Sequence, residues 1–181
     1  SQDPSDIAAR HIAVDAGRSV VASIKNVANG IKDLRQLVSD NIEGNISDFN
    51  KTLDLLASVQ REILGNTSPK STPNNLLDQR DAHLKTLSEF ADVSVDYFKN
   101  NSVRVILGTT GQGQILIDGL NHRNLKLQNV DGASKIFIDN GANSASTIIQ
   151  IQSGEIAGYM AADIALTESK KSMDDLTKSL V

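Results

Sequence analysis

The feature that most constrains the fold is the long stretch between Pro4 and Pro69, which contains no proline. Apolar side chains inside it advance in steps of 4, 3, 4, 3 and 4 residues, at Val20, Ile24, Val27, Ile31, Leu34 and Val38. Alternating steps of three and four are typical of the seam of a coiled coil, where one helix packs on another. The stretch therefore predicts a long helix whose seam residues, Ile24, Val27, Ile31, Leu34 and Val38, need a partner helix.

The spacing changes after Val38, where two successive steps of four lead to Ile42 and Ile46. Such a change predicts a local alteration of supercoiling near Gly44. If the helix is continuous, about 60 residues at 1.5 Å each give a length of roughly 90 Å. A break at Gly30 or Gly44 would instead make two helices.

A second, shorter helix is expected after the Gly, Asn, Ser, Thr and Pro residues of Gly65–Pro73, which mark a connection. Asn75 is a suitable N-cap, with Asp78 expected in the first turn near the positive end of the helix dipole. Leu77, Leu84, Leu87 and Ala91 would share one face. This helix should run back along the first, antiparallel to it.

From Val93 the apolar period changes from helical to two, which is typical of strands. A hairpin is predicted with its turn at Asn100-Asn101, followed by further short strands, at 93–97, 103–107, 114–118, 124–128, 135–139 and 147–152. After Ser153 a helical pattern returns and continues to the end, and this C-terminal helix is the expected partner for the seam of the first. The fold class is therefore α+β: an elongated antiparallel helical bundle with a small antiparallel β-rich insert. We expect a helical rod domain formed by 1–92 plus 153–181 and an insert domain formed by 93–152.

Composition excludes several classes of protein. The formal net charge is −4, from 18 basic and 22 acidic residues, which leaves no basic footprint for nucleic acid. Aromatic residues make up only 3%, so a deep aromatic ligand pocket is not expected. The absence of cysteine removes disulfides and thiolate chemistry, and no apolar run reaches the length of a membrane span. The first residues, which lack an initiator Met, are those expected of an excised or processed chain.

Residues with catalytic or metal-binding chemistry do not form a recognisable site in the sequence. The histidines fall in three separate segments and are interpreted as surface residues rather than metal ligands: His11, His83 and His122. A glycine-rich segment with no following Lys-Ser/Thr is interpreted as a hairpin loop rather than a phosphate loop: Gly108, Gly111 and Gly113. Acidic and amide residues near turns lack calcium-loop spacing: Asp131, Asp139 and Asn140. We therefore expect no enzyme, no cofactor and no metal.

One motif resembles a known family. The run Leu76-Leu77-Asp78-Gln79-Arg80-Asp81 is similar to the Leu-Leu-Asp-x-Arg-Asp signature of the flagellar hook-associated protein 1 family, the proteins of the hook–filament junction. Upstream, Ala8-Ala9-Arg10 before the long helix is similar to the start of that family's helical domain, and Gly154–Gly158 resembles its return turn. Ala162-Asp163 stands where the family often has Arg-Asp, which is a departure.

The resemblance implies a core fragment of a secreted structural subunit of the bacterial flagellum, without its terminal segments. Lateral self-association would form the ring between hook and filament, with hook and filament-junction proteins as neighbours and an export chaperone for the full-length chain. Leu76, Leu77, Asp78, Arg80 and Asp81 would form a structural motif, with the three charged residues at a clasp between helices.

Two alternatives remain open on the sequence. In the first, the β insert is a surface-exposed binding or adhesion module that the helices present, although only Tyr97, Phe98 and Phe137 supply aromatic groups there. In the second, the chain is a hydrolase whose paired carboxylates converge from the strands, with candidates at Asp118, Asp131 and Asp139. The structural-subunit interpretation is preferred to both.

Overall fold

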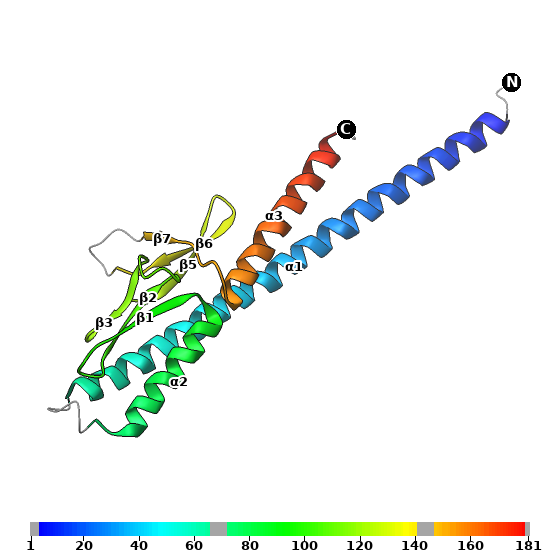
Figure 1. Cartoon of the computed structure of the whole chain (residues 1–181). Coiled ribbons are helices and arrows are strands. Elements are labelled where there is room, and N and C mark those ends of the chain that lie inside the picture. Colours follow the sequence, from blue (N-terminus) through cyan, green and yellow to red (C-terminus); the bar gives the residue numbers. More distant parts are fainter. Residues whose placement is uncertain (1–3, 66–71, 141–146, 180–181) are drawn as a thin grey trace. The chain divides into compact units, whose positions relative to one another are not determined.

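The computed structural model describes residues 4–65, 72–140 and 147–179 of the chain (Figure 1). It contains three helices and two antiparallel sheets, so the predicted α+β class is confirmed. The elements follow the chain as α1 (Pro4–Gly65), α2 (Asn74–Phe90), β1 (Val93–Tyr97), β2 (Val103–Leu107), β3 (Ile115–Asp118), β4 (Asn121–His122), β5 (Leu125–Val130), β6 (Ala133–Ile138), β7 (Thr147–Ile149) and α3 (Glu155–Ser179). The first helix is assigned as one element through Gly30 and Gly44.

The chain divides into two compact units. The core unit is Val38–Asp163, and the helical unit combines Ser1–Leu37 with Ile164–Val181. This division cuts across α1 and α3, whereas the division expected from the sequence separates helices from strands. The expected domains, 1–92 plus 153–181 and 93–152, stay a prediction.

In the core unit, α1 buries one continuous face. Its fully or nearly fully buried residues advance in steps of 4, 3, 4 and 3, at Ile42, Ile46, Phe49, Leu53 and Leu56. α2 folds back alongside this half of α1 (Figure 1), as predicted, and contributes Leu84 and Leu87 to the same cluster. The rings of Phe49 and Phe90 meet edge to face at a centroid distance of 6.4 Å. The helix pair is thus held by packing of apolar faces at helical spacing.

The start of α2 differs from the prediction. The helix begins at Asn74 with Pro73 in the cap position, no side chain caps it, and its first turn contains no acidic residue. The predicted Asn75 cap with Asp78 in the first turn is therefore wrong. The physical reason is that Pro73 fixes its own φ at −59° and lacks an N–H, so the helix can start two residues earlier than the polar pattern indicates.

The strands expected to form one small antiparallel β-rich insert are divided between two sheets. The first has the order β1-β2-β3-β4 and the second β5-β6-β7, and every pairing is antiparallel. The predicted first hairpin is confirmed, with Val93 opposite Leu107 and Tyr97 opposite Val103. In the β5–β6 hairpin, Asp131 and Gly132 have φ of 55° and 80°, and a two-residue turn with both φ positive matches the twist of the strands.

The sheets and helices of the core unit share one apolar cluster. Val105 and Ile117 from the first sheet, Ile138 from the second, Leu53 from α1 and Ile156 from α3 are all fully buried in it. Because strands and helices bury their apolar faces against each other, the strands do not form a separate core. Within the described residues, no helix has the length and apolarity needed to cross a bilayer.

Candidate functional site

The carboxylates that could serve in catalysis do not form a common site in the structure. Asp118 forms an ion pair with Arg104 at 3.2 Å and Asp139 with Lys126 at 2.6 Å, while Asp131 lies in the β5–β6 turn. The described residues contain no group of three or more His, Asp or Glu side chains placed to hold a metal ion. Other polar side chains are wholly or partly buried and join helices to strands. These side chains form the site described below.

Arg80 of α2 is a buried charge of the core unit that contacts several partners. It is 8% exposed, and its Nε and Nη2 donate to Oδ1 of Asp81, each at 2.8 Å. Nη1 donates to the backbone oxygen of Asn101 at 2.8 Å, and the guanidinium lies 5.1 Å from the ring centre of Tyr97. Arg80 thereby ties α2 to the β1–β2 connection through a charge-assisted hydrogen bond and a cation–π contact.

The other residues of the predicted motif take different positions. Leu76 is buried with Val59 and Ile63 of α1, and Leu77 packs partly buried against that cluster. Asp78 is exposed on α2. The contacts described for Arg80 join α2 to a hairpin rather than to another helix, so the clasp role of Asp78, Arg80 and Asp81 between helices stays a proposal.

Gln60 of α1 completes the hydrogen bonding of β2. Its side chain is fully buried, its Nε2 donates to the backbone oxygen of Val103, and its Oε1 accepts from the N–H of Val103 at 3.2 Å. Along an antiparallel strand, the backbone N–H and C=O groups of successive residues point to opposite sides. The backbone oxygen of Ser102 accepts from Phe98 on the β1 side, so the N–H and C=O of Val103 point to the β3 side. β3 ends at Asp118, opposite Arg104, and does not reach Val103. The amide of Gln60 therefore occupies the place of the missing strand.

Asn50, also on α1, does the same for the second sheet. Its Nδ2 donates to the backbone oxygen of Leu125 at 2.9 Å and its Oδ1 accepts from the Leu125 N–H at 2.8 Å. Leu125 begins β5, an edge strand, and its backbone groups point away from β6. Nearby, Asp54 contacts Nε2 of His122 at 2.8 Å. Three polar residues of one helix thus set the position of both sheets on α1.

These interface residues were missed by sequence reasoning, although a signal existed. Gln60 continues the buried face of α1, because it follows Leu56 by four residues and precedes Ile63 by three. A polar amide at an apolar position must satisfy its hydrogen bonds inside the protein. Such a residue is therefore a candidate for a bond to another element, although the pattern does not identify the partner.

The predicted seam residues are only partly covered. Ile24 and Ile31 are half-buried, while Val27 and Leu34 are each 52% exposed. Val38 packs partly buried against the core cluster. Within residues 7–37 and 164–179, no side chain of the helical unit is buried. The role of these residues as a seam stays a proposal.

Comparison with known proteins gives consistent matches. Residues 1–181 match the sequence model of the family described as "Flagellar hook-associated protein FlgK helical domain". Flagellar hook-associated protein 1 of Bacillus subtilis (strain 168) is 24% identical over 100 residues, which cover 55% of this chain and 20% of that protein. The solved structure of the flagellar hook junction protein FlgK from Burkholderia pseudomallei aligns with a TM-score of 0.74 and 24% identity, over 88% of this chain and 29% of that one. The chain thus spans less than a third of the length of either protein.

Proposed function

Because this chain belongs to the family of flagellar hook-associated protein FlgK helical domains, we propose that it is a structural part of the junction between hook and filament of a bacterial flagellum. The observation that carries the proposal is the family match over residues 1–181. The agreement in fold with the hook junction protein of Burkholderia pseudomallei supports it.

The proposed role is mechanical rather than catalytic. In the core unit, the buried polar side chains of Gln60 and Arg80 bind backbone groups of other elements. These bonds fix the helices relative to the strands. A segment that transmits force between two tubes needs such fixed connections, because packed interiors and satisfied polar networks resist deformation.

We further propose that the segment associates with copies of itself to build the junction ring, with hook and filament-junction proteins as neighbours. The full-length chain would use an export chaperone, and the assembled protein would lie outside the cell. Exposure of Val27 and Leu34 supports self-association, since apolar seam residues gain stability when a partner helix covers them.

The alternative, an adhesion module presented by the helices, finds less support. A presented module needs a core of its own, whereas the strands share theirs with α1, α2 and the start of α3.

The proposal is tested in the source bacterium by replacing two exposed seam residues in the full-length protein, Val27→Asp with Leu34→Asp. Since both side chains are exposed, the fold should tolerate the change while a helix–helix contact should not. Filaments counted by electron microscopy should fall at least tenfold, and filament protein should accumulate in the medium.

The matched control is Ala22→Asp with Asn29→Asp, which adds the same charge at the same spacing on an exposed face away from the seam. Filament number should stay near the wild-type value. Deletion of the whole gene distinguishes the junction role from the adhesion role. If filaments were normal and surface attachment were lost, adhesion would be favoured and the junction role overturned.

A further inference from the structure

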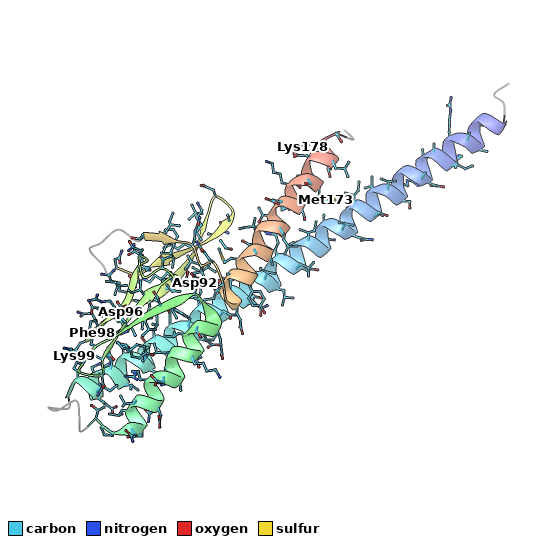
Figure 2. The ribbon with its side chains drawn as sticks, in the orientation of Figure 1. Asp92, Asp96, Phe98, Lys99, Met173 and Lys178 are labelled. Atoms are coloured by element: carbon cyan, nitrogen blue, oxygen red, sulfur yellow. The ribbon has the colours of Figure 1, made fainter. Side chains whose placement is uncertain are left out.

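Two aspartates of the core unit, Asp92 and Asp163, are buried without serving the Arg80 or Gln60 contacts. Asp92 is 7% exposed and lies between the end of α2 and the start of β1, and Figure 2 labels it there. Asp163 is 4% exposed and lies two turns into α3. A buried carboxylate is costly unless it accepts hydrogen bonds, so the groups bound to each indicate its role.

Asp92 binds the segment that leads into α3. Its Oδ1 accepts from the backbone N–H of Gln152 at 2.9 Å and of Ser153 at 3.3 Å, groups 60 and 61 residues away in the chain. Its own backbone oxygen accepts from the N–H of Gly108 at 2.7 Å. One residue therefore joins the end of α2, the end of β2 and the start of the return to α3.

Gly154 brings the same segment against the end of α2. Its φ is +91°, and a Cβ built there would lie 2.5 Å from the backbone oxygen of Phe90 and 2.7 Å from the nitrogen of Ala91. Only a glycine allows this approach without displacement. The first helical hydrogen bond follows, from the Gly158 N–H to the Gly154 oxygen at 3.2 Å.

Asp163 makes a second attachment two turns later. Its Oδ2 accepts from the backbone N–H of Ser134 in β6 at 3.3 Å. In the β5–β6 hairpin Ser134 faces Asn129 as a non-hydrogen-bonded pair, so its N–H points to the side of β7, where pairing stops at Ile136. The carboxylate thus occupies a vacant ladder position, as Gln60 and Asn50 do.

Between the two attachments, α3 packs on the core. Ile156 is fully buried, and Tyr159 and Met160 pack partly buried against the core cluster. These positions and Asp163 stand at i, i+3, i+4 and i+7 and therefore share one helix face. The first turns of α3 are held at both ends by carboxylate–backbone bonds and between them by apolar contact.

We propose that Asp92 and Asp163 form a two-point latch that docks the first turns of α3, Glu155–Asp163, onto the completed sheets. The latch closes only when the ends of α2 and β2 and the strand β6 are in place, because Asp92 follows α2, Gly108 after β2 binds the backbone oxygen of Asp92, and Ser134 of β6 binds Asp163. Loss of either carboxylate releases this part of α3 by local opening while the remainder of the core unit stays folded. The inference does not depend on the proposed flagellar role.

Hydrogen–deuterium exchange of the purified chain tests the latch, with peptides from 155–163 compared with peptides from β2 and from the buried part of α1. Asp92→Ala and Asp163→Ala should each accelerate exchange in 155–163 at least about fivefold, because the first removes the acceptor of the Gln152 and Ser153 N–H groups and the second that of the Ser134 N–H. Exchange in β2 and α1 should change less than about twofold. Asp92→Asn keeps one acceptor oxygen and should give a smaller acceleration in 155–163.

Asp96→Ala is the control, since Asp96 is an exposed acid of the adjoining strand and should leave 155–163 unchanged. Equal acceleration in every segment, or none in 155–163, would overturn the latch. If Asp92→Ala proves unfolded, Asp92→Asn and Asp163→Ala decide: both must accelerate exchange selectively in 155–163, and the proposal fails if either leaves that segment as it is in the wild type.

Discussion

Gln60 and Val103 are joined by a pair of hydrogen bonds in which a helix side chain binds a strand residue as a neighbouring strand would. The amide oxygen of Gln60 accepts from the Val103 N–H at 3.2 Å and its nitrogen donates to the Val103 oxygen. Both residues are fully buried and lie 43 positions apart in the chain. The contact fixes the first sheet on α1 at a defined residue, which apolar packing alone would not do.

Replacing Gln60 with Ala should destabilise the chain by about 2–4 kcal/mol, because the Val103 N–H and oxygen are left buried without partners. Chemical denaturation followed by circular dichroism measures the change. Gln128→Ala, at an exposed position of β5, is the control and should change stability by no more than about 0.5 kcal/mol. A loss of the same small size for Gln60→Ala would contradict the assigned role.

Asn50→Ala should cost about 1–3 kcal/mol, because Leu125 loses both bonds that Asn50 supplies. Asn50 and Gln60 are ten residues apart on α1, roughly 15 Å, and they bind different sheets. The double variant should therefore lose the sum of the two single losses to within about 0.5 kcal/mol. A clear departure from additivity in the same denaturation assay would show that the two sheets respond as one.

Arg80→Lys should be nearly as destabilising as Arg80→Ala, with a loss of about 2–3 kcal/mol, although lysine keeps the charge. Lysine lacks the planar fork that reaches Asp81 and Asn101 together. Melting temperatures of both variants measure the effect, with Arg123→Ala as a control at an exposed position. Full retention of stability by Arg80→Lys would mean that charge alone matters at this position.

Two glycine substitutions should have opposite effects. Gly44→Ala should stabilise the chain by about 0.5–1 kcal/mol, because Gly44 lies inside α1 with nothing within 4 Å of a Cβ built there. Gly154→Ala should destabilise it by about 2 kcal/mol or more, since φ is +91° and the methyl group would meet Phe90. Calorimetry on the two variants gives the comparison, and a shift of the same sign in both would be inconsistent with the assigned backbone roles.

Local patterns predicted the elements well. The alternation of steps of three and four predicted α1, and the apolar period of two predicted the hairpin from Val93 to Leu107, because each pattern reports which face of one element is buried. The start of α2 was misplaced because the geometry of Pro73 outweighs the capping preference of Asn75. The split into two sheets was missed, since the pairing of strands depends on contacts between residues distant in the chain.

The residues that join elements were harder to predict. Arg80 was singled out as part of a motif, but its bond to Asn101 spans 21 residues and leaves no periodic signal. The same holds for Asp92, whose partners Gln152 and Ser153 are backbone groups that any residue type except proline could supply. The side chain that makes such a contact can be read from the sequence. Its partner cannot, because the partner is a backbone group whose position depends on the fold.

The bond between Asn50 and Leu125 spans 75 residues, and this separation has a kinetic consequence. Helical turns form within about a microsecond, but a contact that closes a long loop must first overcome the entropy of that loop. α1 can therefore become helical early, whereas its contact with β5 forms late. Folding of the core unit should be limited by this late arrival, so the apolar face from Ile42 to Leu56 is exposed to solvent, and to other chains, for most of the folding time.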